Sequence, residues 1–170
     1  MLCDKRVSLG LKGKVYRRVV RPAILYGSEC WPLKKLQVQR LMVAEMRMVR
    51  WMCGFTRLDG IRNVVIRNLA GVAPIEEKMR ESRLRWFGHV KRRSVAAPVR
   101  RCEMIVPPGG RRGRGRPKKS LGEVVREDLR VVGLTEDMTQ DRRLWWDRIK
   151  VSDCRGPAAL VVVASVGWGR

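Results

Sequence analysis

The sequence is poor in the residues that build metal sites and catalytic centres. It contains one histidine, His89, and five cysteines that are widely spaced and form no C-x-x-C pair. Zinc sites draw on closely spaced cysteine and histidine ligands, so we expect reduced intracellular thiols and no metal. His89 has no carboxylate or cysteine companion nearby in the sequence, and we expect a structural role for it. Adjacent acids such as Glu76 and Glu77 point about 100° apart on a helix and do not share one metal ion.

Long apolar runs are also missing. The first residues, MLCDKR, are followed by no apolar segment of the kind that directs secretion. The longest uncharged stretch, residues 156–169, is shorter than the roughly 20 apolar residues that cross a bilayer. We therefore expect an intracellular protein with no membrane partner, no cofactor and no catalytic residue. We also expect an N-terminal tail at residues 1–10 and a disordered, apolar C-terminal tail at residues 152–170.

Positive charge is what the sequence has in excess. Lysine and arginine number 38 against 16 acidic residues, which gives a formal charge of +22. Such an excess predicts a polyanionic partner, because each phosphate that a cationic side chain neutralises releases condensed counterions. An anionic membrane surface is the rival polyanion, but the chain has no basic amphipathic helix with a broad apolar face and no lipidation motif. The charge therefore favours nucleic acid, either DNA or RNA.

The charge is concentrated in one region. Residues 80–119 hold fourteen lysines and arginines against two acids, a net +12, whereas residues 120–151 have a net charge of −1. The second region is thus better suited to packing or to contact with a helical protein partner than to phosphate binding.

Apolar residues recur with a helical period along most of the chain, and the sequence predicts an all-α fold. We expect a helical module over residues 11–93, a flexible, disordered basic linker over residues 94–119, and a helical pair over residues 120–151. Gly54, Gly71 and Gly133 are expected helix ends. The expected helices cover residues 32–53, 60–70, 74–93, 120–133 and 139–150, and the helix in residues 11–26 is expected to break at Pro22.

Two further features make specific predictions. Glu45 lies in the apolar face of the helix over residues 32–53, where a charge is costly unless it is paired, so we expect an arginine from another element to reach it. Ser120 and Glu123 have the spacing of a capping box and predict a helix start at Ser120.

Aromatic residues among arginines have two interpretations. Trp51, Trp86 and Phe87 either stack on bases while the arginines contact phosphates, or belong to a helical core. Trp86 shares a helix face with Met79 and Val90, which favours the core for it, whereas Phe87 lies off that face and is more open.

The sequence RRGRGRPKK at residues 111–119 resembles an AT-hook, the minor-groove-binding peptide of high-mobility-group A proteins. An extended R-G-R-P segment fits the floor of a narrow A·T-rich groove, whose negative potential attracts arginine, and the flanking cations contact phosphates. The other interpretation is a generic basic tail that acts as a nuclear import signal or binds RNA without specificity. Both interpretations place the segment on a polyanion, and we expect the protein in the nucleus. The nucleic-acid-binding residues expected are Arg111, Arg112, Arg114, Gly115, Arg116, Pro117, Lys118 and Lys119, together with Lys91, Arg92 and Arg93.

Several segments resemble the region downstream of the polymerase domain in LINE-type non-LTR retrotransposon reverse transcriptases, especially those of plants. They are VYRRVVRPAILYGSECW (residues 15–31), AEMRMVRWMCG (44–54), RESRLRWFGHVKRR (80–93), RGRGRPKK (112–119) and LTEDMTQDR (134–142).

The resemblance implies a thumb-like helical module that grips a template and primer duplex, followed by a basic extension. The family's polymerase activity depends on an Asp-Asp pair that binds two metal ions, and this sequence contains no such pair. We therefore expect a truncated retroelement-derived chain that binds nucleic acid without catalysis. The alternatives are a thumb-like accessory part that works with a palm supplied elsewhere, an AT-hook chromatin-binding protein, and a relic with no selected role.

Overall fold

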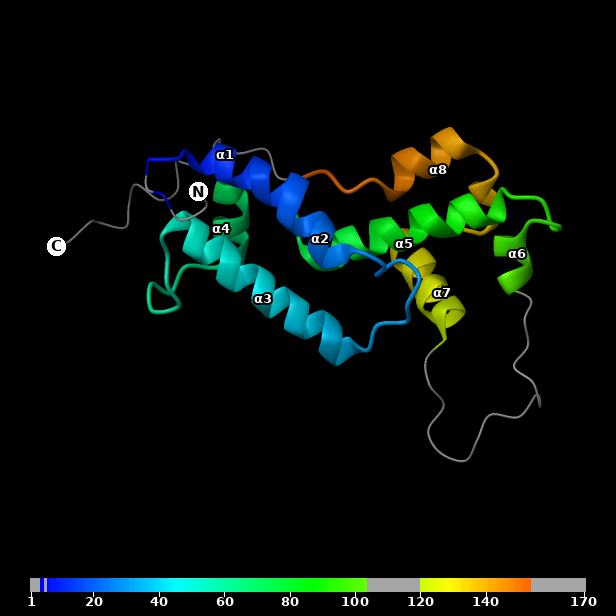
Figure 1. The fold of residues 1–170 in the computed structure, drawn as a ribbon, viewed down its shortest axis with the longest axis horizontal. Coiled ribbons are helices and arrows are strands. Elements are labelled where there is room, and N and C mark those ends of the chain that lie inside the picture. Colours follow the sequence, from blue (N-terminus) through cyan, green and yellow to red (C-terminus); the bar gives the residue numbers. More distant parts are fainter. Residues whose placement is uncertain (1–3, 5, 104–119, 154–170) are drawn as a thin grey trace, which may run out of the picture. The chain divides into compact units, whose positions relative to one another are not determined.

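The computed structural model describes residue 4 and residues 6–103 and 120–153. The regular elements in these residues are all helical, with no strand among them, which confirms the all-α class expected from the sequence. Within the same residues no helix combines the length and apolar composition needed to span a bilayer. The elements, drawn in Figure 1, are α1 (Leu9–Val15), the π-helix η1 (Tyr16–Val20), α2 (Arg21–Leu25), α3 (Lys35–Cys53), α4 (Asn63–Ala70), α5 (Ile75–Lys91), α6 (Pro98–Glu103), α7 (Leu121–Val132), the 3-10 helix η2 (Asp137–Thr139) and α8 (Arg142–Ile149).

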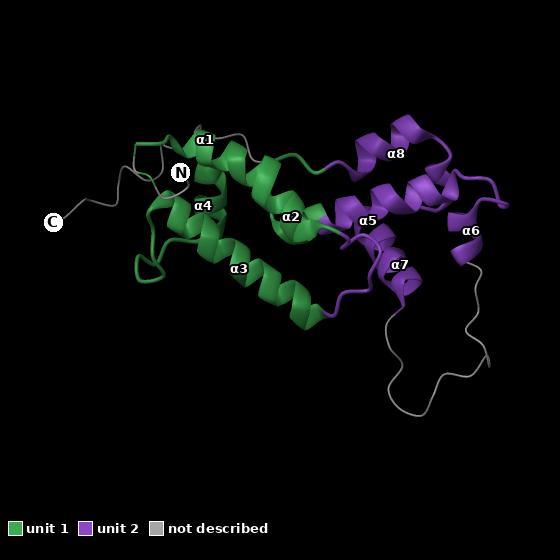
Figure 2. Cartoon of the chain, in the orientation of Figure 1, with its two compact units in different colours: residues 1–26, 35–78, 151–170 green, residues 27–34, 79–150 purple. Residues whose placement is uncertain are grey.

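The chain forms two compact units, each assembled from separate stretches of sequence (Figure 2). Unit 1 comprises residues 1–26, 35–78 and 151–170, and unit 2 comprises residues 27–34 and 79–150. The division falls within α5, whereas the sequence placed the end of the first helical module at Arg93. Charge and composition change after Arg93, but the boundary between the units lies where the contacts with one apolar core end and those with the other begin.

Unit 1 is built around an apolar core to which η1, α3 and α4 contribute, and α1 contacts both α3 and α4. Gly13 of α1 approaches α4 so closely that a Cβ at this position would collide with the carbonyl of Ala70. At the C-terminal end of α3, Lys12 Nζ donates to the Met52 carbonyl at 3.2 Å. The last carbonyls of a helix have no partner within the helix, and this bond satisfies one of them. The buried core residues are Tyr16, Met46, Val49, Met52, Ile66, Ala70 and Val72.

A carboxylate lies inside this core. Glu45 of α3 is 0% exposed, and Arg67 of α4 donates to its Oε2 at 3.2 Å. This ion pair confirms the expectation that an arginine from another element reaches Glu45. The Tyr16 hydroxyl donates to Oε1 at 3.1 Å and the Ile75 N–H donates to Oε2 at 3.2 Å. Both carboxylate oxygens are thus satisfied, as burial of a charge requires.

The predicted break at Pro22 is wrong. The chain stays helical from Leu9 to Leu25, because η1 inserts a π-helical turn just before the proline. A proline inside an α-helix lacks an N–H and clashes with the carbonyl four residues back. The wider turn relieves this conflict locally, and the Arg21 N–H bonds to the Tyr16 carbonyl, five residues back.

Unit 2 packs the second part of α5 with α7 and α8 around a separate core. Trp145 of α8 is fully buried, and its indole N–H donates to the Leu84 carbonyl at 3.1 Å. Gly88 lies against the indole, where a Cβ would collide with the ring. The buried residues of this core are Leu84, Val125, Leu129, Leu134, Trp145 and Ile149.

Helix α7 has the ends that the sequence predicted. The Ser120 N–H donates to the Glu123 carboxylate at 2.9 Å, and the Glu123 N–H donates to the Ser120 hydroxyl at 3.3 Å, which forms the capping box. Gly133 ends the helix with a φ of 71°. A bidentate ion pair also ties α7 to α5, with Arg83 Nε and Nη2 at 2.7 and 3.1 Å from the two Asp128 oxygens.

The expected linker over residues 94–119 is helical in part. Residues Pro98–Glu103 form α6, so the absence of a helical period there misled the sequence prediction for these residues. Proline at the start of a helix loses no hydrogen bond, because the first N–H groups have no partner within the helix. Residues 104–119 lie outside the described part of the chain.

Candidate nucleic-acid interface

The AT-hook-like segment, residues 111–119, lies outside the described residues, so its eight expected binding residues remain sequence predictions. The other three expected residues, Lys91, Arg92 and Arg93, lie at the end of α5 and just beyond it, in unit 2. Lys91 ends α5, and Arg92 and Arg93 follow it outside the helix, where Arg93 Nε lies 3.4 Å from His89 Nε2.

Lys91 and Arg92 are partly committed to holding unit 2 together. Lys91 Nζ lies 3.4 Å from the Glu136 carboxylate and 5.1 Å from the centre of the Phe87 ring. Arg92 Nη1 donates to the Thr139 carbonyl at 2.8 Å. The fixed position of Arg92 places it on the wall of a cleft, and it is the one expected residue, among those described, that lines this cleft.

The cleft combines aromatic rings with arginines, and we call it the arginine–tryptophan cleft. It belongs to unit 2 and has a volume of 920 Å³. Side chains from α5 and α8 form most of it, with Glu29 from the short segment of residues 27–34. It is lined by Glu29, Ser82, Arg85, Trp86, His89, Arg92, Arg142, Arg143, Trp145 and Trp146.

The aromatic rings of the cleft already make contacts of the kind that bases make. Trp86 stacks on His89 with ring centres 5.8 Å apart and ring planes 24° from parallel. The Arg85 guanidinium carbon lies 4.6 Å from the centre of the Trp146 ring, a cation–π geometry. Trp146 remains 41% exposed despite this contact. The rings are therefore held in place and still accessible.

The cleft is strongly electropositive. Four arginines line it against one carboxylate, that of Glu29, and Arg85 is paired with Glu81, one turn earlier on α5. Burial, and then the positive charge of Arg142, lower the pKa of the Arg92 guanidinium below its ordinary value. The effect of Arg142 shows that positive charge is crowded at this end of the cleft, a condition that an anion relieves.

The sequence assigned two of the aromatic residues on α5 the wrong way round. Trp86 and Phe87 are both half-buried, but Phe87 packs against the core of unit 2, whereas Trp86 lines the cleft. The sequence prediction put Trp86 in the apolar face of the helix because Met79 and Val90, which are both buried, lie on the same side. Leu84 and Phe87, three residues apart, mark the side that faces the core of unit 2.

Trp146, Arg142 and Arg143 were not singled out from the sequence. The adjacent pair Trp145 and Trp146 does carry a signal, because neighbouring residues on a helix lie about 100° apart and cannot both face one core. Trp145 is 2% exposed and Trp146 41% exposed, so the pair places one indole in the core and the other on the surface.

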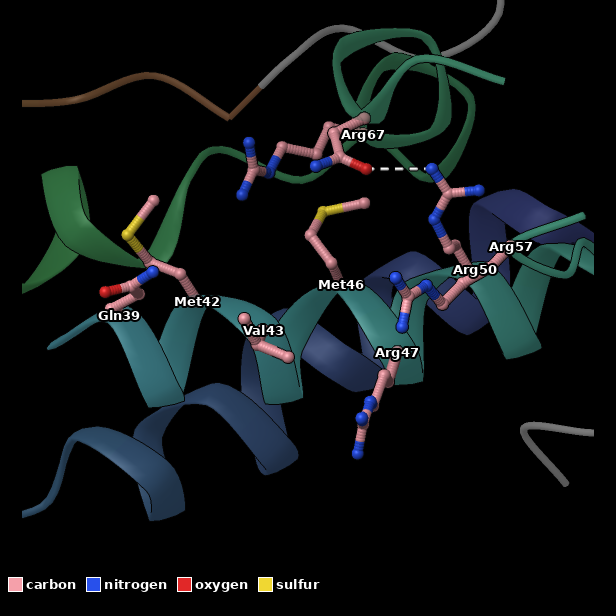
Figure 3. Close-up of a pocket in the computed structure, with 9 residues that line it drawn as sticks. Gln39, Met42, Val43, Met46, Arg47, Arg50, Arg57 and Arg67 are labelled. Carbon is pink, nitrogen blue, oxygen red and sulfur yellow. Dashed lines mark hydrogen bonds between the residues drawn. The ribbon is translucent and has the colours of Figure 1, made fainter. Parts of the chain in front are cut away.

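A second hollow lies in unit 1, against α3 and α4 (Figure 3). It has a volume of 510 Å³. In Figure 3 the Met42 and Met46 side chains extend from α3 toward the side where Arg67 lies, and Arg47 extends away from it. The lining residues are Gln39, Met42, Val43, Met46, Arg47, Arg50, Arg57, Asn63 and Arg67.

Two of the four arginines in this hollow have structural roles. Arg67 pairs with the buried Glu45, and Arg50 donates to the carbonyls of Thr56 and Ile61 at 3.0 and 2.6 Å and to the Asn63 side chain at 2.8 Å. Trp51 of α3 is 64% exposed but does not line the hollow. The hollow thus leaves two arginines for an anion, as the cleft does, but unlike the cleft it has no aromatic ring.

The arginine–tryptophan cleft is therefore the leading candidate site in the described part of the chain. Across residues 6–103 and 120–153 the structure shows no cluster of three side chains suited to holding a metal ion. Comparison of the chain with protein-family models, with curated protein sequences and with solved structures gives no match.

Proposed function

We propose that this chain binds nucleic acid without catalysing a reaction, and that the arginine–tryptophan cleft is one of its contact surfaces. One observation carries the proposal: accessible indole rings and four arginines line the same cleft with a single carboxylate. Nucleic acids offer both partners that this surface needs, since bases stack on aromatic rings and phosphates pair with guanidinium groups.

The charge of the whole chain supports the same partner. The formal charge of +22 attracts phosphates over the range of the Debye length, about 10 Å at 0.1 M salt. The exposed Arg142 and Arg143, which form no ion pair with any described residue, are suited to direct phosphate contact. Affinity should then fall as the salt concentration rises, because binding releases counterions from the phosphates and this release is less favourable into a more concentrated solution.

The proposal includes an origin and a location. The sequence resemblance to non-LTR retrotransposon reverse transcriptases supports a retroelement-derived chain, and the basic segment at residues 111–119 supports the nucleus as its location. A thumb-like accessory role is distinguished from simple binding by a primer-extension assay. Under the accessory role the chain stimulates a separately supplied palm-containing polymerase, and under simple binding it does not.

The test of binding is a salt titration of the full chain with a fluorescent oligonucleotide, followed by anisotropy. The variant Arg142→Gln with Arg143→Gln should weaken binding, and it should reduce the slope of log affinity against log salt by about 1 for each lost phosphate contact. The control, Arg18→Gln with Arg40→Gln, removes the same charge from exposed positions of unit 1 and should change the slope less.

Two results would contradict the proposal. Affinity that does not depend on salt would show that phosphate contacts do not drive the interaction. Equal effects of the two double variants would show that binding depends on total charge and would remove the cleft as a specific contact surface.

A further inference from the structure

The arginine–tryptophan cleft offers ring surfaces as well as charge, and this limits the form of nucleic acid that fits it. A double helix hides the faces of its bases inside the stack and presents phosphates, sugars and base edges. Indole faces are of little use against that exterior. An unpaired base, in contrast, exposes a flat face that an aromatic ring covers.

The size of the cleft agrees with a small ligand rather than with a duplex surface. Its 920 Å³ falls in the range of about 300–1,000 Å³ that is typical of sites for small molecules and cofactors. A cleft of this volume has room for one base with its sugar.

The ring contacts within the cleft are of the kind that a stacked base makes. The Arg85 guanidinium carbon lies 4.6 Å from the centre of the Trp146 ring. Because the guanidinium is flat and delocalised, a base can stack on the indole beside it or take its place. Trp86 and His89 form a nearly parallel stack, so their positions are fixed before a ligand arrives. Rings that are already ordered lose little conformational entropy on binding.

Three arginines of the cleft are in positions suited to the phosphates of a single strand. Arg142 and Arg143 begin α8, one turn before Trp146, and Arg92 is held at the wall of the same cleft by its bond to the Thr139 carbonyl. A base stacked on Trp146 therefore brings its adjoining phosphates close to guanidinium groups.

We propose that the arginine–tryptophan cleft receives an unpaired nucleobase of a single strand, stacked on Trp146 and flanked by phosphates on Arg142 and Arg143. The inference rests on the proposed nucleic-acid binding and adds the form of the ligand. It makes the cleft a site for single strands, gaps or frayed ends rather than for continuous duplex.

The test compares three ligands with the same number of nucleotides, and therefore about the same charge, each with the full chain. They are a single strand with 2-aminopurine at its centre, the same strand with central abasic sites, and a duplex closed at both ends by non-nucleotide linkers. Stacking is worth about 1–3 kcal/mol per base, so the intact strand should bind about ten-fold more tightly than the abasic one. The 2-aminopurine fluorescence should be quenched on binding, and affinity for the closed duplex, which exposes no internal base face, should not depend on Trp146.

Variants assign the effect to the cleft. Trp146→Ala should abolish the difference between intact and abasic strands, whereas Trp146→Phe should keep most of it. Trp51→Ala removes an indole that is also exposed, on unit 1, and should leave the difference unchanged. Because Trp146 is already partly exposed, these variants should retain the fold, which urea unfolding checks.

The outcomes separate this inference from the proposed function. If intact and abasic strands bind equally, with affinity that still falls as salt rises, base stacking is overturned and nucleic-acid binding stands. If Trp51→Ala removes the difference and Trp146→Ala does not, the cleft is overturned as the site. If none of the three ligands binds, the proposed function fails and this inference fails with it.

Discussion

Single residues in this protein show both the reach and the limit of reasoning from sequence. Glu45 stands out because a charge in an apolar helix face needs a partner, and that reasoning predicted the arginine that the structure supplies. It did not predict which arginine, nor the Tyr16 hydroxyl and Ile75 N–H that complete the site. Those partners lie 29 and 30 residues away, and only the packing of helices determines them. Burial and the neighbouring charge of Glu45 raise the pKa of Tyr16 far above its ordinary value.

Asp153 provides a pH-dependent contribution to the stability of unit 1. Arg21 donates to both of its oxygens, at 2.6 and 2.9 Å, and the Ala73 N–H donates at 3.0 Å. Burial alone would raise the pKa of Asp153, but the hydrogen bonds from Arg21 and Ala73 and the charges of Arg21 and Lys78 outweigh it. They hold the pKa below its ordinary value. A lowered pKa in the folded state means that the charged carboxylate favours folding.

The sign of this contribution gives the first prediction. The stabilisation is complete above the unfolded-state pKa of about 4 and is lost as the pH falls through the lower folded-state pKa. Asp153→Asn should lower the free energy of unfolding by about 2 kcal/mol at pH 7, because Arg21 loses its charged partner. Urea unfolding from pH 7 to pH 2 should then show a smaller acid-induced loss for the variant than for the wild type. An exposed control, Asp147→Asn on α8, should unfold like the wild type, and an equal acid response of wild type and Asp153→Asn would exclude this role.

At the scale of elements, helix ends were predictable and irregular helices were not. Gly54, Gly71 and Gly133 follow α3, α4 and α7 with φ values of 77°, 64° and 71°, a conformation that glycine adopts without strain. These signals are local in sequence. The π-helical turn before Pro22 and the short helix α6 depend on surroundings that no short sequence window contains. Propensity and period therefore gave the boundaries of the amphipathic helices and missed the exceptions.

The contact between α5 and α8 leads to a prediction about Gly88. An added Cβ would collide with the Trp145 indole, which is fully buried and bonded to the Leu84 carbonyl. Alanine improves helix propensity by about 1 kcal/mol over glycine, yet overpacking of a tight core typically costs about 1–3 kcal/mol. Gly88→Ala should therefore destabilise the protein in urea or leave it no more stable, and it should shift the tryptophan fluorescence of the folded state.

The matched control is the same substitution at Gly122 of α7, where a Cβ would meet nothing within 4 Å. Gly122→Ala should raise the free energy of unfolding by up to about 1 kcal/mol. A stabilising effect of similar size at Gly88 would mean that α5 and α8 are not packed as closely as the structure shows.

At the scale of the whole molecule, composition and packing divide the chain in different places. The change in composition after Arg93 suggested that α5 belongs with what precedes it, whereas its second part shares a core with α7 and α8. Leu84 and Trp145 meet across 61 residues of sequence, and a contact of that range leaves no periodic signal. The candidate cleft could not be predicted for the same reason, since residues around 85 and around 145 form it together. Among its lining residues, Arg92 was an expected binding residue, and Trp86 was considered for base stacking but assigned to the core.

The chain thus carries two proposed contacts with different preferences, and they should be separable by mutation. The cleft is proposed for unpaired bases, and the AT-hook-like sequence at residues 111–119 is proposed for duplex minor grooves. Arg114→Ala with Arg116→Ala should reduce the preference for A·T-rich over G·C-rich duplex, because these arginines are the ones expected in the groove. Lys118→Ala with Lys119→Ala should weaken binding to both duplexes alike, since phosphate contacts carry no sequence information. Competition binding at constant salt measures both effects. Neither double variant should alter the ratio of the affinities for intact and abasic single strands, whereas Trp146→Ala should abolish that difference. If the arginine double variant leaves the A·T preference unchanged, residues 111–119 are a generic basic segment.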